Sequence, residues 1–399
     1  MENNSSEDNQ GVPVIESQDI NSDEQSIIRG DNIGDSTYSA RWTLNTLLSL
    51  SKIDEQEWSE EFETDLCYLW DMATEKDVMF FLMQNNFFSI AENIFRTSEE
   101  RRLLEIIAGI ISNMCSQNNI LEKIGESNDF VDSILDLLSC DDSGVLIQVV
   151  RILQAAAWGI QKNESSKWRE HMTRCEILGD SLTFILKSST NSILLTGALK
   201  LVQSISIVEL SDNTIFLQQL FDVNPLLLAL VEALNQLIPT EEENDTSEQQ
   251  DIIEIWLDVL SNILHDESSS TPEIYDSINK IFVKILSSKE HNLTSLEEST
   301  ALCIQECVEI IQWFQDKKFK TDVKLVSVIA AIMYKLNIII SSNQNSSTVR
   351  ELLGYLQMFW LDIYEEYEET KTKINELWEF CSREVRDYLI NYTLNGTSL

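Results

Sequence analysis

Apolar residues return at helical spacing along most of the chain. The stretch from Arg101 to Ala157 shows this most clearly, with RRLLEIIAGIISNM, a polar break, FVDSILDLLS and then VLIQVVRILQAAA. Apolar residues three and four apart share one face of a helix, whereas a half-buried strand alternates apolar and polar positions. The pattern therefore predicts short amphipathic helices joined by polar turns, and an all-α fold.

One helical pattern occurs five times, with the order apolar, mostly polar, apolar, apolar, polar, variable, mostly apolar. Its copies start at residues 108, 150, 199, 257 and 308, so successive starts are 42, 49, 58 and 51 residues apart. A period of roughly 40 to 47 residues with two or three helices is typical of armadillo and HEAT repeats. The extra length falls in polar insertions such as TEEENDTSEQQ. The chain is therefore predicted to be an armadillo-like α-solenoid, a superhelical stack of short helices.

Composition along the chain predicts four regions. The N-terminal residues are polar and acidic with few apolar positions, so they are expected to be a disordered acidic tail. The ends of a repeat array must cover an exposed apolar face, which predicts capping helices on both sides. The regions are a tail at 1–29, N-terminal capping helices at 30–98, repeats at 99–320 with a polar loop at 239–250, and C-terminal capping helices at 321–395.

Asp-Ser pairs precede several shorter apolar runs. They occur at Asp132, Asp180 and Asp276. Asp and Ser side chains accept hydrogen bonds from the free N–H groups of the first helical turn. The pairs therefore predict a cap at the start of each short helix.

The charge is strongly acidic, with 67 Asp and Glu against 28 Lys and Arg and a formal net charge of −39. Nucleic acids and anionic membranes bind proteins through Lys and Arg, so neither is an expected partner. Basic protein segments complement such a surface. The longest apolar run, which starts at Val326 and contains Lys335, is only 15 residues and predicts a buried helix rather than a membrane span. The oligomeric state is left open by these features.

The seven cysteines are scattered in apolar helical runs, and no CxxC pair occurs. The start MENNSSEDNQ lacks the basic and apolar regions of a secretory signal. Reduced thiols in the cytosol or nucleus fit this usage best.

The third helices of armadillo repeats line a concave groove, so their polar positions are the candidate binding surface. The groove would change from basic to acidic along the chain, and we expect an extended segment with complementary charged halves to bind there. The alternative interpretation is a merely solvated helix face. The candidate residues are Gly109, Ser112, Asn113, Arg151, Gln154, Lys200, Gln203, Asp258, Ser261, Asn262, Glu309 and Gln312.

Catalytic motifs are missing from the sequence. GxxxxGK[ST], GxGxxG, GxSxG and HExxH do not occur. His171 with Cys175, and Cys303 with Cys307, have helical spacing, but two ligands do not complete a tetrahedral zinc site. The sequence therefore predicts no enzyme, no catalytic residue, no cofactor and no metal site.

The segment AGIISNM resembles the third-helix signature of armadillo repeats, A-G-x-L-x-N-L. Residues 30 to about 120 resemble the serum amyloid A-like (Saal) family more closely. That resemblance implies an armadillo-like fold without enzymatic activity, placed mainly in the nucleus and linked to cell proliferation. Its matching residues are Gly30 to Gly34, Tyr38, Ser39, Trp42, Cys67 to Met72, Asp77, Val78, Phe81, Leu82, Glu105, Ile106, Gly109, Ile110, Asn113 and Met114.

Three kinds of interaction protein are candidates. The first is a scaffold or adaptor that binds protein partners through the groove, in the nucleus or the cytoplasm, with the nucleus favoured by the family resemblance. The second is an import-type receptor, which would need a tryptophan four residues before each groove asparagine. Gly109 and Asp258 stand at those positions before Asn113 and Asn262. The third is an adaptor for histones or other basic proteins that uses residues 1–29 or the loop at 239–250.

Overall fold

The computed structural model describes most of the chain and divides it into two compact units. Its units are residues 1–94 and residues 95–399. The predicted tail at 1–29 and residues 239–245 of the predicted loop lie outside the described residues. The described ranges are 31–53, 58–210, 214–238, 246–264, 272–293, 296–342, 347–370 and 372–396.

The predicted all-α fold is confirmed. Within the described ranges, extended pairing is limited to two isolated bridges, Asn32 with Ser39 and Glu209 with Ile215. The other regular elements in these ranges are helices.

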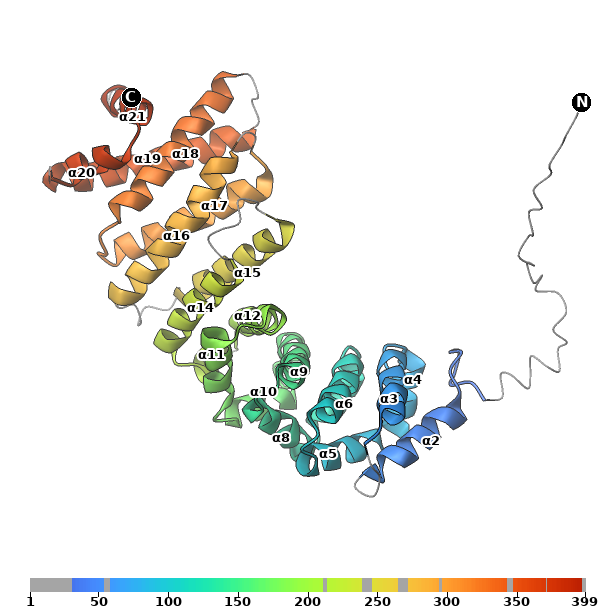
Figure 1. Cartoon of the computed structure of the whole chain (residues 1–399). Helices are drawn as coiled ribbons and strands as arrows, with labels where there is room; N and C mark the ends of the chain where they lie inside the picture. The colour runs from blue at the N-terminus through green and yellow to red at the C-terminus, as the bar shows by residue number, and fades with distance from the viewer. Residues whose placement is uncertain are drawn as a thin grey trace, which may run out of the picture. The chain divides into compact units, whose positions relative to one another are not determined.

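In the described part of the N-terminal unit, residues 31–53 and 58–94, the chain forms four helices (Figure 1). They are α2 (Ala40–Leu50), α3 (Glu60–Met72), α4 (Lys76–Gln84) and α5 (Phe87–Thr97), whose last residues belong to the second unit. Residues 31–39 fold back as a tight loop before α2. The Asp35 amide donates to Asp77 Oδ2 over 2.8 Å, and Gly34 has φ of 56°, a left-handed conformation that suits glycine.

The second unit contains the remaining helices, most of them paired with helices about one repeat away in the sequence. The first of them are α6 (Arg101–Met114), α7 (Asn118–Gly125), α8 (Asn128–Asp136), the 3₁₀ turn η2 (Leu137–Ser139), α9 (Ser143–Lys162), α10 (Lys167–Arg174), α11 (Leu178–Ser188) and α12 (Ser192–Ser206). The others are α13 (Leu217–Leu220), α14 (Val223–Leu237), α15 (Ser247–Leu264), α16 (Pro272–Asn292), α17 (Glu298–Asp316), α18 (Val323–Ser341), α19 (Ser347–Thr370), α20 (Thr372–Phe380) and α21 (Arg383–Gly396).

These helices form two rows. In the first row, α6, α9, α12, α15, α17 and α19 each pack against the next, and in the second row α11, α14, α16 and α18 do the same (Figure 1). Up to α15 each repeat contains three helices, and after α15 each repeat contains two. This stack, with its apolar core between the rows, is the armadillo-like arrangement that the period predicted.

The regular packing continues beyond the predicted start of the C-terminal cap at residue 321. Helix α18 packs on α16, and α19 packs on α17, so they form one more pair of the array. Helices α20 and α21 pack on α18, and the Trp360 indole N–H in α19 donates to Thr393 Oγ1 in α21 over 3.0 Å. The part that ends the array is therefore α20 and α21.

Among the residues that the structure describes, two helices, α9 and α18, are long and apolar enough to cross a membrane by length and composition alone. In the structure α9 packs between α6 and α12, and α18 packs between α16 and α19. Of the apolar window in each helix, 61% in α9 and 50% in α18 is buried inside the protein. Core helices of a helical array are often this long and this apolar. The buried helix predicted around Lys335 is α18.

The Asp-Ser pairs do not cap the helices as predicted. Helices α8, α11 and α16 begin four, two and four residues earlier, so Asp132, Asp180 and Asp276 lie inside them. The helices start earlier because apolar residues before each pair are buried, among them Phe130 and Leu178. Burial of the apolar face, rather than the best local cap, sets these starts.

The first-row helices have other caps. Asp142 accepts the Val145 amide at the start of α9, and Asn191 accepts the Leu194 amide at the start of α12. At the start of α15, Thr246 and Gln249 exchange two bonds of a capping box, Thr246 Oγ1 accepting the Gln249 amide and Gln249 Oε1 accepting the Thr246 amide. The predicted loop at 239–250 is therefore too long at its end, where residues 247–250 already belong to α15.

Asn191 gives a direct test of these caps. We expect Asn191→Ala to lower the free energy of unfolding by about 1 kcal/mol, because the first turn of α12 loses its acceptor. The matched control is Asp180→Ala inside α11, with an expected effect of a few tenths of a kcal/mol because it removes no cap. Urea unfolding followed by circular dichroism measures both, and equal losses would contradict this assignment of the caps.

Candidate protein-binding groove

Hydrogen bonds between successive first-row helices bring the predicted polar positions together on one face. Arg151 Nη2 on α9 donates to Asn113 Oδ1 on α6 over 3.1 Å. Gln203 Nε2 on α12 donates to Asp258 Oδ2 on α15 over 2.7 Å. Gln312 on α17 accepts the Tyr355 hydroxyl of α19 over 2.6 Å. These bonds place predicted polar positions where α6 meets α9, where α12 meets α15 and where α17 meets α19.

Three of the predicted residues contribute less to this face than expected. Gly109 and Ser112 are buried in α6, so neither can contact a partner. Asn262 is half-buried and donates to Ser206 Oγ on α12 over 3.1 Å. Its bond fastens α15 to α12, so its role in the structure is to hold two helices together.

The basic half of the face is a groove of about 630 Å³ in which Arg151, Gln154 and Lys200 lie. It is lined by α9, α12, the end of α14 and the start of α15, with apolar side chains such as Ile147 and Val150 between the polar ones. Glu248 on α15 adds one carboxylate to the lining, but it forms no ion pair with either cation. Gln148 Oε1 accepts Arg151 Nη1 over 2.7 Å, and together with Asn113 it fixes the direction of the guanidinium. Two neutral acceptors thus orient the charge without neutralising it.

Both positive charges of this groove are exposed. Within the described part of the chain, neither Arg151 nor Lys200 has a carboxylate as an ion-pair partner. This is unexpected in a protein with 67 acidic and only 28 basic residues, where a nearby carboxylate is the common outcome. The two cations therefore remain available to a negatively charged ligand.

The acidic half follows directly along the row. Glu254 and Asp258 lie on α15, and Glu306 and Glu309 lie on α17, which packs on α15. Partial burial of Glu306, and then repulsion from the other three carboxylates, raises the pKa of Glu306 to about 7. A small hollow of about 140 Å³ beside them is lined by Glu306, Glu309 and residues including Trp313. The arrangement favours a ligand that brings positive charge.

Sequence reasoning missed three residues of this face: Trp158, Glu306 and Trp313. Trp158 lies seven residues after Arg151, on the same side of α9, and its exposed indole donates to Ser204 Oγ on α12 over 3.1 Å. Glu306 lies three residues before Glu309. Arg151 with Gln154, and Glu309 with Gln312, are predicted positions three residues apart. Continuing each of these pairs by one helical turn would have found Trp158 and Glu306.

The candidate metal-ligand pairs have structural surroundings. His171 is buried, and its Nε2 lies 2.9 Å from the carbonyl oxygen of Gly125. Cys303 and Cys307 are both buried in α17. The described residues contain no group of three or more His, Cys, Asp or Glu side chains that could hold a metal ion.

Comparison with family models gave no match. Among curated proteins, Protein saal1 of Danio rerio is 30% identical over 250 residues, which cover 58% of this chain and 51% of that protein. Protein SAAL1 of Homo sapiens is 27% identical over 266 residues, which cover 59% of this chain and 52% of that protein. The chain therefore spans about half the length of the curated relatives it matches.

Solved structures of similar architecture include designed armadillo repeat proteins. One of them is 16% identical, covers 67% of this chain and 98% of its own, and gives a TM-score of 0.41. Another, solved in complex with the peptide (KR)4, is 17% identical with the same coverage and a TM-score of 0.41. The chain is therefore similar to the SAAL1 proteins over nearly three fifths of its length, and its helices form an armadillo-like stack.

Proposed function

We propose that the chain is a non-enzymatic protein-interaction scaffold that binds an extended protein segment along the row α6 to α19. An acidic part of the segment lies against Arg151 and Lys200. A basic part lies against the carboxylates of α15 and α17. The observation that carries the proposal is the pair of exposed cations without a carboxylate partner, next to a crowded acidic cluster on the same row of helices.

The physical basis is complementary charge on a preformed surface. The helices that carry both halves are fixed by the core and by bonds such as Gln203 to Asp258, so a ligand meets side chains that are already placed. Opposite charges across an interface mainly set which partner binds and in which register. A segment with only one sign of charge would leave one half of the groove facing like charge or unpaired.

The cellular setting is also a proposal. It rests on the resemblance to the Saal family, and it places the chain mainly in the nucleus in a process linked to cell proliferation. Because the chain spans about half the length of its relatives, functions located in the remainder of those proteins do not transfer with the matched part.

A synthetic peptide with an acidic half and a basic half tests the groove. We expect the double variant Arg151→Glu with Lys200→Glu to weaken its binding roughly tenfold, since two exposed charges change from attractive to repulsive. Fluorescence anisotropy of the labelled peptide measures the affinity. The matched control is Lys162→Glu with Lys187→Glu, which changes the net charge equally at exposed sites outside the groove.

The two double variants separate local recognition from overall charge. If both weaken binding equally, or if the groove variant binds as well as the unchanged protein, the proposed groove is wrong. Removing residues 1–29 gives a third arm. Loss of peptide binding in that deletion alone would favour the adaptor that acts through its acidic tail.

A further inference from the structure

We propose that a second recognition site, in the N-terminal unit, binds an arginine side chain of a basic protein segment. The site is a pocket of about 450 Å³ between α3 on one side and the loop before α2 with the start of α2 on the other. It lies within the unit of residues 1–94 and shares no residue with the groove of the second unit. Its lining is Thr37, Tyr38, Ser39, Trp42, Asp65, Tyr68, Asp71 and Met72.

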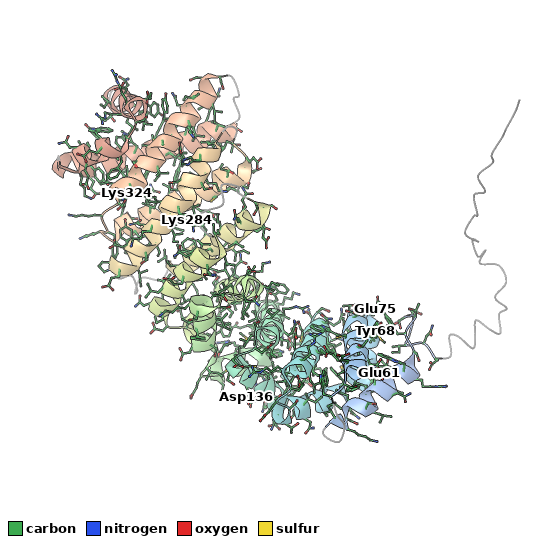
Figure 2. The ribbon with its side chains drawn as sticks, viewed as in Figure 1. Glu61, Tyr68, Glu75, Asp136, Lys284 and Lys324 are labelled. Atoms are coloured by element: carbon green, nitrogen blue, oxygen red, sulfur yellow. The ribbon has the colours of Figure 1, made fainter. Side chains whose placement is uncertain are left out.

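One wall of the pocket is a single face of α3. Asp65, Tyr68 and Asp71 follow one another at intervals of three residues, so they stand above each other along the helix. Tyr68 has 58% of its surface exposed, although it is aromatic (Figure 2). Met72, one turn after Tyr68, is buried and also lines the pocket. The wall thus offers an accessible ring flanked by two carboxylates.

The opposite wall is held by the loop of residues 31–39. Ser39 Oγ donates to Asp31 Oδ2 over 2.5 Å and accepts the Trp42 amide over 3.1 Å, which caps α2. The Ile33 amide donates to the carbonyl of Tyr38 over 2.9 Å. Bonds at Tyr38, Ser39 and Trp42 therefore fix the backbone that carries the two rings, so the pocket is formed before any ligand binds.

The chemistry of the lining selects a cation. Tyr38, Trp42 and Tyr68 supply aromatic faces, which attract cationic groups. Within the described ranges, Asp65 and Asp71 have no ion-pair partner, so their charges are not already neutralised. An acidic ligand would be repelled, and an apolar ligand would cover the two carboxylates without pairing them.

Arginine fits this combination better than lysine. Its planar guanidinium stacks on an aromatic ring and donates to a carboxylate from its edge at the same time. A lysine ammonium is compact and strongly hydrated, so it gains less from the rings and loses more water on entry. The pocket is therefore assigned to an arginine within a basic segment, in keeping with the acidic charge of the whole chain.

Three peptides test this assignment: a glycine-serine peptide with arginines, the same peptide with lysines, and the same peptide with the neutral isostere citrulline. We expect the arginine peptide to bind the full chain at least fivefold more tightly than the lysine peptide, and the citrulline peptide to bind still more weakly. Asp71→Asn and Tyr68→Ala should each reduce the affinity for the arginine peptide about fivefold and remove the preference over lysine. Both side chains are exposed, so circular dichroism should show an unchanged fold.

Glu75→Gln is the matched control, because it removes one exposed carboxylate from the same unit outside the pocket (Figure 2). It should leave the arginine preference intact, and so should Glu309→Gln in the groove. Equal binding of the arginine and lysine peptides to the unchanged protein would overturn the proposal. So would a preference that persists in Asp71→Asn and disappears in Glu309→Gln, since recognition would then belong to the second unit.

Discussion

Replacing Trp168 by alanine is expected to lower the free energy of unfolding of the surrounding repeats by about 3–5 kcal/mol, which is the cost of a large cavity in a packed core. Trp168 on α10 is fully buried, and its indole N–H donates to the carbonyl of Leu121 on α7 over 2.9 Å. Its ring also fills the space above Gly125, where an added Cβ would lie 2.9 Å from Cδ1. The variant loses packing and a buried hydrogen bond together, so its apparent melting temperature should fall on the order of 10 °C.

Trp158→Ala is the control for this variant. Trp158 lies nearby in sequence and also donates through its indole, but 49% of its surface is exposed, so its loss should cost less than about 1 kcal/mol. Hydrogen exchange gives a local readout, because repeat arrays can open one unit at a time. Faster exchange confined to α7 and α10 is expected for Trp168→Ala. Equal melting temperatures for the two variants would show that Trp168 is not a support of the core.

The repeat pattern predicted the face of the candidate groove but not which of its residues are accessible. Arg151, Gln203 and Asp258 lie on the shared face because a helical period fixes which positions point the same way. Accessibility depends on how closely neighbouring helices pack, and Gly109 and Ser112 on α6 are buried. How closely two helices pack depends on the side chains of both repeats, so the pattern within one repeat does not reveal it.

Helix starts show a similar limit. Asn191 begins α12 as a local cap should, with its Oδ1 accepting the Leu194 amide. Asp180 has the same local chemistry, yet α11 has already begun at Leu178, which is buried. Local capping preference is a small contribution, and burial of an apolar face one turn earlier outweighs it.

The N-terminal pocket could not be predicted from spacing at all. Tyr38 and Tyr68 are thirty positions apart in the sequence, and only the folding of the loop onto the N-terminal unit places them around one space. Several residues that carry the family resemblance line this pocket, among them Trp42 and Asp71. A sequence match located the residues without indicating that they meet.

Glu306→Gln is expected to stabilise the protein at pH 8 by about 1–2 kcal/mol and to have almost no effect near pH 4.5. The pKa of Glu306 is raised to about 7 from its ordinary value of 4.5, so the folded state holds the proton more tightly than the unfolded state. Stability therefore falls as the pH rises from about 4.5 to about 7 and then stays constant. A shift of this size corresponds to roughly 3 kcal/mol, and partial contact with solvent reduces it.

Urea unfolding at both pH values measures this difference, and Glu232→Gln on α14 is the control, since Glu232 is exposed. A gain of the same size at both pH values would contradict carboxylate repulsion as the cause.

The same repulsion links stability to binding, because a basic side chain placed beside Glu306 supplies the missing counter-charge and lowers the pKa of Glu306 again. The synthetic peptide with an acidic half and a basic half should therefore bind more tightly at pH 8 than at pH 6. Glu306→Gln should remove most of that pH dependence. A pH dependence that survives the substitution would place the basic half of the ligand elsewhere.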